Sequence, residues 1–186
     1  MMNNLVYSFL YSEKKDLDFS IIEKERGIVL PLSYKIFLNK YKVGDESLNK
    51  QSYLDEDIGF KLPLVSYQYK QNEFLLELDS FLSLETALDD RPYDDPVLGD
   101  DGLNLIRIAY SSFPSGGGVY LGLNRDNFGF IYRVDWDGDE NTTAIKISND
   151  LFQFLSILEP VIIDDNLDYT NFYKNWGEDF WRKKEV

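Results

Sequence analysis

Carboxylates are the side chains with the greatest capacity for chemistry in this sequence. Its 186 residues include 33 Asp and Glu but no His and no Cys. The composition therefore excludes Ser-His and Cys-His nucleophile pairs, thiol chemistry and zinc sites built from Cys or His. An enzyme of this composition would have to work with carboxylates, Lys, Tyr, Ser or Thr.

The acids gather in two clusters. Eight acids and a single base, Arg91, lie between Asp79 and Asp101, and a second cluster surrounds Trp136. Carboxylates pair with Lys and Arg of a partner, while aromatic side chains supply buried contact area. For each residue, a solvated acidic loop with no partner is the alternative. We predict that the clusters bind a partner protein through Asp89, Asp90, Asp94, Asp95, Asp100, Asp101, Asp135, Trp136, Asp137 and Asp139.

The net charge of −14 narrows the choice of partner. Repulsion from phosphates disfavours direct binding of DNA or RNA. A basic protein is favoured instead, because long-range attraction accelerates its encounter with an acidic one. Acidic composition also serves solubility alone, so the charge does not identify a partner by itself.

Two motifs suggest small ligands, and both are incomplete. Asp135–Glu140 places acids at alternate positions, as calcium loops do, but lacks the Gly and Glu spacing of an EF-hand and falls in an expected turn. Ser115–Gly118 is rich in glycine but has no following Gly-Lys-Ser/Thr. Paired carboxylates could hydrolyse glycosides, yet pairs are inevitable among so many acids. We expect no metal, no cofactor and no enzymatic activity; a carboxylate enzyme or ligand-binding module remains a third hypothesis.

The positioning elements begin with two helices, expected at about residues 17–26 and 31–41. Gly27 suits the left-handed end of the first helix, with Asp16 or Asp18 as its cap, and Pro31 suits the start of the second. Four apolar residues of the second helix fall on one face, at positions i, i+3, i+4 and i+7: Tyr34, Phe37, Leu38 and Tyr41.

Strands joined by short turns dominate the remainder. We expect strands at about 58–67, 74–78, 103–108, 119–123, 128–134 and 143–147, a short helical turn after Ser83, and a loop over 89–102. The 119–123 strand should be half-buried. A last helix should run from Ser148 or Asn149 to about Glu159 and end at Pro160. This order predicts an α+β fold: a mainly antiparallel sheet, with an N-terminal helix pair and a C-terminal helix packed against it.

The domain should span residues 1–160, followed by an extension over 161–186. The extension mixes charges with Tyr169, Phe172, Tyr173, Trp176, Phe180 and Trp181. Such aromatics rarely stay in water, so we expect the extension to pack on the domain. No apolar run reaches the length of a membrane span, and no secretion signal or disulfide framework is present, which favours a cytoplasmic location.

Four segments, in order, resemble the SUKH superfamily. They are Gly27 and Leu30-Pro31 followed by Tyr34, Phe37 and Leu38; the segment 81–85; Ile108-Ala109 with a glycine-rich turn, a hairpin and Asp135-Trp136; and Ile147-Ser148 with 151–155. Departures occur at Lys42-Val43-Gly44, where an Asn-Gly pair is common in the family, and at 147–151, where Ala-x-Ser-Phe is common.

This superfamily contains a yeast regulator of cell-wall synthesis and many bacterial immunity proteins. The resemblance therefore implies a non-enzymatic, bacterial immunity protein that binds and neutralises a toxin domain, which we expect to be a basic nuclease of a polymorphic or contact-dependent toxin system. The alternative is a protein-binding scaffold or signalling adaptor similar to the yeast protein. The identity of the toxin and the oligomeric state do not follow from the sequence.

Overall fold

The fold is an α+β arrangement of one sheet and short helices. A computed structural model describes residue 7 and residues 9–44, 47–48, 58–63, 73–113, 117–136 and 142–162. Its elements follow one another along the chain as α1 (Phe19–Arg26), α2 (Leu32–Lys40), β1 (Ile58–Pro63), β2 (Glu73–Phe81), α3 (Leu84–Asp89), β3 (Leu105–Phe113), β4 (Gly118–Gly122), β5 (Ile131–Trp136), β6 (Thr142–Ser148), α4 (Leu151–Ile157) and β7 (Glu159–Ile162).

The predicted helix pair is present, and local polar contacts set its ends. The Asp18 carboxylate accepts a hydrogen bond from the backbone N–H of Ser20, which caps α1, and Gly27 ends this helix with φ of 64°. Glu23 joins the two helices, because its Oε1 accepts from the backbone N–H of Leu30 at 2.6 Å and lies 2.6 Å from Lys35 Nζ. Polar contacts of Glu23 therefore fix the connection between α1 and α2.

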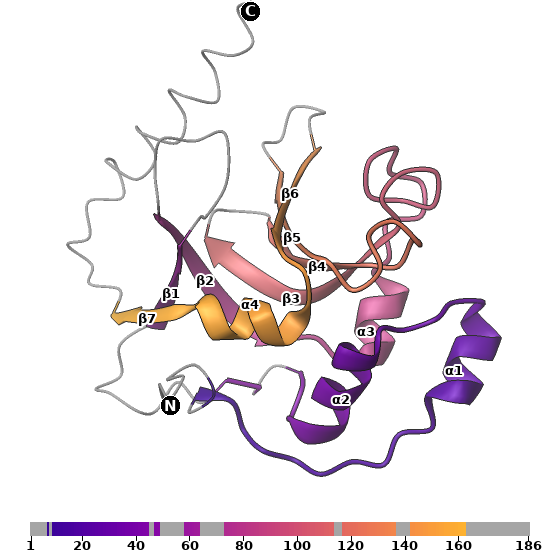
Figure 1. The fold of residues 1–186 in the computed structure, drawn as a ribbon, viewed down its shortest axis with the longest axis horizontal. Helices are drawn as coiled ribbons and strands as arrows, with labels where there is room; N and C mark the ends of the chain where they lie inside the picture. The colour runs from indigo at the N-terminus through magenta and orange to yellow at the C-terminus, as the bar shows by residue number, and fades with distance from the viewer. Residues whose placement is uncertain are drawn as a thin grey trace, which may run out of the picture.

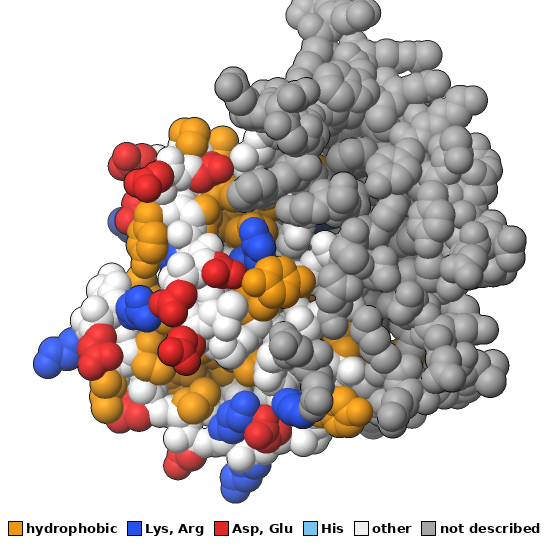
Figure 2. All heavy atoms as spheres, turned by 180° about the vertical axis from the view of Figure 1, so that it is seen from behind, with side chains coloured by type: hydrophobic (Ala, Val, Ile, Leu, Met, Phe, Trp, Pro, Cys, Tyr) orange, Lys and Arg blue, Asp and Glu red, His pale blue; other side chains and the backbone are white. Residues whose placement is uncertain are grey.

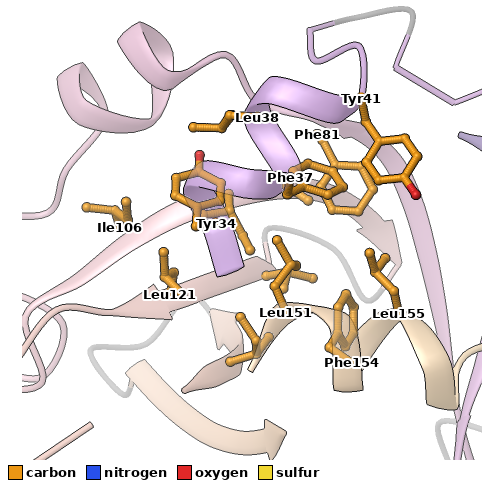
Figure 3. Packing of buried hydrophobic residues seen from close by; sticks show 14 of the residues in the cluster. Tyr34, Phe37, Leu38, Tyr41, Phe81, Ile106, Leu121, Leu151, Phe154 and Leu155 are labelled. Carbon is orange, nitrogen blue, oxygen red and sulfur yellow. The ribbon is translucent and has the colours of Figure 1, made fainter. Parts of the chain in front are cut away.

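The apolar face predicted for the second helix forms the centre of the core. Tyr34, Phe37, Leu38 and Tyr41 are all buried, and the rings of Phe37 and Phe81 lie 4.9 Å apart. From the opposite side, α4 contributes Leu151, Phe154 and Leu155 to the same cluster (Figure 3). The helix pair and the last helix therefore contribute to one hydrophobic core.

The strands form a sheet in the order β6-β5-β4-β3-β2-β1-β7, and every neighbouring pair is antiparallel. β2 links the two halves of the sheet, since its first residues pair with β1 and its last residues pair with β3. Figure 1 shows α4 in front of the strands. In this view α2 and α3 lie to the right of α4, and α1 lies farther to the right. The predicted antiparallel α+β class is confirmed.

Both faces of the central strands are covered. Ile106, Val119, Leu121 and Ile131 point into the core beneath the helices. Because successive residues of a strand point to opposite faces, their neighbours Leu105, Tyr120, Tyr132 and Val134 form a second cluster on the other face, together with Leu98. Every residue of β4 is buried, so the prediction of a half-buried strand at 119–123 was wrong; the segment carrying Leu98 covers its second face.

The C-terminal part of the fold differs from the prediction in three ways. The side chain of Asp150, rather than Ser148 or Asn149, caps α4 by accepting from the N–H of Gln153 at 2.9 Å. The helix ends at Ile157, and β7 follows instead of a longer helix, so Pro160 lies in a strand at the sheet edge where its missing N–H is tolerated. β7 pairs with β1 and crosses the expected boundary at residue 160. The expectation for residues 163–186 lies outside the described residues.

Candidate protein-binding site

The loop predicted to bind a partner is a folded cover of the sheet. This acidic loop, residues 90–104 between α3 and β3, contains five Asp and one Arg. Its Leu98 is completely buried in the second cluster against Tyr120, Tyr132 and other side chains. Farther across the sheet, Asp95 Oδ2 accepts a hydrogen bond from Thr142 of β6 at 3.2 Å. The loop therefore spans the sheet from β3 to β6.

Local backbone contacts give the acidic loop a compact shape. Asp95 Oδ1 accepts from the backbone N–H groups of Val97 and Leu98, each at 2.8 Å. Neither glycine of the loop has room for a side chain: a Cβ on Gly99 would lie 2.3 Å from the carbonyl oxygen of Tyr93, and one on Gly102 would lie 2.3 Å from that of Val97. Asp95 therefore has a structural role that sequence patterns did not indicate.

Three asparagines fasten the acidic loop to the β4–β5 turn. Nδ2 of Asn124 donates to the carbonyl of Gly102 at 2.9 Å, and Nδ2 of Asn127 donates to that of Leu103 at 2.6 Å. Asn104 adopts φ of 51° and bonds the Asn124 side chain. Sequence reasoning missed this clasp. A concentration of Asn at the start and end of a short turn was the available signal, since Asn tolerates left-handed backbone and bonds nearby backbone groups.

A buried arginine offsets part of the loop's negative charge. The side chain of Arg91 is 7% exposed, and its Nη2 bonds both the Asp100 carboxylate and Asn104 Oδ1. Its guanidinium lies 4.6 Å from the centre of the Tyr93 ring, which remains 47% exposed. Arg91 therefore packs against the ring of Tyr93. Because it also pairs with Asp100, the charge of that carboxylate is only partly available to a partner.

The predicted acids of this region divide into two groups. Asp89 forms an ion pair with Arg26 at 2.7 Å, and Asp90 accepts from the Tyr110 hydroxyl at 2.9 Å, which raises the pKa of Tyr110 by stabilising the protonated phenol. Together with Asp95 and Asp100, they have partners within the protein. Asp94 and Asp101 are exposed and have no ion pair or hydrogen bond with another described side chain. These two carboxylates are therefore the most available to a partner.

The second predicted cluster begins at the end of β5. Asp135 and Trp136 belong to β5, where they pair with Thr143 and Thr142, so the expectation that Asp135 opens a turn was wrong. The hydrogen bond from Thr142 to Asp95 brings the acidic loop to this strand end. The fold therefore brings together the two clusters that the sequence separates. Asp137 and Asp139 lie outside the described residues.

Surface charge is mixed rather than uniform. In Figure 2, red carboxylate side chains gather at the upper corner of the described part and lie beside blue basic side chains elsewhere. The helix hairpin, residues 19–40, carries four basic and two acidic residues, in contrast to the acidic loop. A partner therefore meets a surface with a local negative region rather than an entirely negative one.

Large apolar side chains are exposed on the outer side of the helix hairpin. Val29, Leu32 and Ile36 are 62%, 71% and 45% exposed. The β4–β5 turn lies against this region, because Gly129 is packed on the Pro31 ring, with a Cβ position 3.5 Å from Pro31 Cβ. Phe128 on that turn is also exposed. The same turn bonds the acidic loop through its asparagines, so it connects the apolar and acidic surfaces.

No group of three or more acidic side chains in the described part of the chain is arranged to hold a metal ion. None of the described helices is long and apolar enough to cross a bilayer.

Comparison of the chain with models of protein families, with curated proteins and with solved structures gave no match. The observations themselves define an α+β domain with a compact acidic loop next to an apolar helical surface.

Proposed function

We propose that this protein is a bacterial immunity protein of the SUKH superfamily, which acts in the cytoplasm by binding and neutralising a toxin domain without chemistry of its own. One observation carries the proposal: the acidic loop is held in a compact shape while Tyr93, Asp94 and Asp101 remain exposed on it. A surface of this kind suits protein recognition better than a mobile acidic tail would.

The acidic loop suits protein recognition because it is already ordered before a partner binds. A loop that is already ordered loses little conformational entropy on binding, so more of the contact energy appears as affinity. Tyr is frequent among residues that dominate interface energies, and exposed carboxylates attract a basic surface and speed the encounter. A nuclease toxin has a basic groove for its substrate phosphates, so an acidic partner could cover that groove.

The apolar side chains next to the acidic loop support the same proposal. Leu32, Ile36 and Phe128 are exposed on segments joined by the packing of Gly129 on Pro31. Protein interfaces commonly combine an apolar centre with a polar rim. We therefore expect the toxin surface to carry apolar residues beside its basic ones.

The proposed family membership is supported by the order of the elements. Gly27 ends the first helix, the second helix buries Tyr34, Phe37 and Leu38, and an antiparallel hairpin precedes the last helix. These are the positions on which the resemblance rests.

Co-expression tests the function. The chain would be produced with the toxin domain encoded next to it, and survival, co-purification and affinity would be measured. The double variant Asp94→Lys/Asp101→Lys reverses the two acids that have no described partner, and we expect at least about a tenfold loss of affinity. Glu25→Lys reverses an exposed acid on α1, outside the acidic loop; this control should change affinity by less than about threefold.

The outcomes separate the hypotheses. Absence of both protection and binding would reject the immunity function, while binding of other cellular proteins without protection would favour the adaptor. Equal effects of the double variant and the control would reject the acidic loop as the contact surface.

A further inference from the structure

Arg107 of β3 is held in a fixed position on the sheet face opposite the helices. Its Nε donates to the Tyr120 hydroxyl at 2.8 Å. Its guanidinium carbon lies 5.3 Å from the centre of the Tyr110 ring and 5.4 Å from that of Tyr120, within the range of cation–π attraction. These contacts restrict the side chain before any ligand arrives.

Gly118 lies next to Arg107 and Tyr120. Gly118 pairs with Tyr110 in the sheet, and a Cβ on it would lie 3.4 Å from Arg107 Cδ and 3.3 Å from Tyr120 Cε2. A side chain at position 118 would clash first with the backbone carbonyl oxygen of Ala109, 2.9 Å from the Cβ position, and would press on the Tyr120 ring. The hydroxyl of Tyr110 is itself fixed by its bond to Asp90.

Arg107 differs from two other arginines of the described chain in lacking a carboxylate partner. Arg26 pairs with Asp89, and Arg91 pairs with Asp100. No described carboxylate lies within ion-pair distance of Arg107, whose side chain is only partly buried. Nε donates to the Tyr120 hydroxyl, and the guanidinium also forms a hydrogen bond with the Tyr110 side chain. The remaining N–H groups of the planar guanidinium can still donate to a carboxylate.

We propose that Arg107 binds a carboxylate side chain of the partner protein, while Asp90 binds a neighbouring Lys or Arg of the same partner. Asp90 suits this role because Tyr110 uses one of its oxygens and the residue is exposed. The site rests on the proposed function, since it assumes that the partner is a protein. It also lies directly beside the acidic loop, of which Asp90 is the first residue.

The surroundings favour a protein carboxylate over a free phosphate. Burial raises the pKa of Tyr120, Arg107 lowers it, and the negative charges of Asp95 and Asp90 raise it again. Asp90 lies beside the guanidinium's aromatic neighbours, because its Oδ2 accepts from the Tyr110 hydroxyl at 2.9 Å. A doubly charged phosphate would be repelled by the negative charges of Asp90 and Asp95 more strongly than a single carboxylate accompanied by a cation.

Nuclear magnetic resonance of the arginine side chains tests the site without the toxin. The full chain, labelled with nitrogen-15, would be titrated with the peptide acetyl-Lys-Glu-Lys-amide, with the matched peptide acetyl-Lys-Gln-Lys-amide, and with inorganic phosphate. We expect a saturable shift of the Arg107 Nε–Hε signal with the Glu peptide and at least about tenfold weaker binding of the Gln peptide. The exposed Arg125 of the β4–β5 turn is the internal reference.

Three results would overturn the proposal. The Arg107 signal could drift no more than that of Arg125, the two peptides could bind equally, or phosphate could saturate the site at lower concentration than the Glu peptide. Tyr120→Phe removes the hydroxyl that holds Nε and should weaken the Glu peptide by about threefold to tenfold. An unchanged affinity in this variant would contradict the positioning role of Tyr120.

A toxin arm separates this inference from the proposed function. In the complex, Arg107→Lys keeps the charge but loses the planar fork, and we expect about a tenfold loss of affinity, against less than about threefold for Arg125→Lys. If the peptide binds Arg107 but no toxin binds the chain, the proposed function fails and the site stands. If the toxin binds and Arg107→Lys equals Arg125→Lys, the site fails and the function stands.

Discussion

The helix hairpin and the acidic loop use their side chains in opposite ways. The hairpin buries the face that its periodicity marks, and leaves Val29, Leu32 and Ile36 in water. The loop buries an apolar residue that no periodicity marks, Leu98, and draws several of its charged residues into internal contacts. In the hairpin, a prediction from apolar character places too many residues in the core. In the loop, a prediction from charge leaves too many residues in solvent.

This difference shows what determines availability to a partner. A helix has a face geometrically opposite to its core, so apolar residues placed there stay exposed whatever their type. A loop has no fixed face, and its compact shape comes from polar contacts such as those of Asp95 and Arg91. Which side chains stay available at the surface therefore depends on tertiary contacts and not on residue type alone.

The largest expected effect contrasts the two faces of α2. Phe37→Ala removes a fully buried ring at the centre of the core and should lower the free energy of unfolding by about 3–5 kcal/mol. Leu32→Ala, on the outer face of the same helix, should change it by less than about 0.5 kcal/mol. Urea unfolding measured by circular dichroism checks both. Similar losses for the two variants would mean that the outer face is covered.

The next effect tests the anchor of the acidic loop. Leu98→Ala should lower the free energy of unfolding by about 2–3 kcal/mol, because it opens a cavity under the loop. Val29→Ala, an apolar residue of the hairpin that is exposed, should have little effect in the same urea titration. A harmless Leu98→Ala would show that the loop does not pack on the sheet, and the pre-organised binding surface would be lost with it.

A smaller effect separates the inner and outer acids of the loop. Asp95→Ala removes two hydrogen bonds to backbone N–H groups and one from Thr142, and should lower the free energy of unfolding by about 1–2 kcal/mol. For the neighbouring Asp94→Ala, the free energy of unfolding should lie within about 0.5 kcal/mol of the wild-type value, but binding of the proposed toxin partner should weaken. The reverse pattern in thermal unfolding and affinity measurements would contradict the division of the acids.

The smallest expected effect on the free energy of unfolding comes from Glu23, between α1 and α2, and it depends on pH. Burial would raise the pKa of Glu23, but hydrogen bonds from Lys35 and the Leu30 N–H and the charge of Lys35 together lower it. The folded pKa is thus below the unfolded one, so this stabilisation is present above the unfolded pKa and disappears as the pH falls through the folded pKa.

Glu23→Gln should therefore lower the free energy of unfolding by about 1 kcal/mol at pH 7 and less at acidic pH. Urea unfolding of both proteins at several pH values measures the difference. A difference that grows on acidification would contradict the assigned contacts. Lys24→Gln, an exposed neighbour, controls for the loss of a surface charge.

Much of the fold was predictable because its signals are local. The Gly27 and Pro31 joint, the buried face at Tyr34 and Phe37, and the β4–β5 hairpin all follow from backbone preference and periodicity. β7 was not predictable in this way. A four-residue strand containing Pro160 has a weak local pattern and forms because β1 offers it an edge.

The candidate site was predictable only as a region. The acidic loop was expected at the correct place, and its internal contacts were not. Asp95, Arg91 and the three asparagines act through partners that lie from 2 to 47 residues away. The spacing of residues along the chain does not encode the distant partners. The sequence predicts Arg107 and Tyr120 only as strand residues. The register of β3 and β4 places them opposite each other.

The sequence by itself determined the class of the fold, the buried face of the second helix, the excess of acid and the absence of thiol and imidazole chemistry. Those properties depend on composition and on short-range periodicity, which a single chain displays directly. Only the tertiary structure decided which carboxylates are free, which apolar residues stay in water and where an arginine lacks an acid. Each of those depends on contacts between distant segments, and such contacts exist only after the sheet has folded.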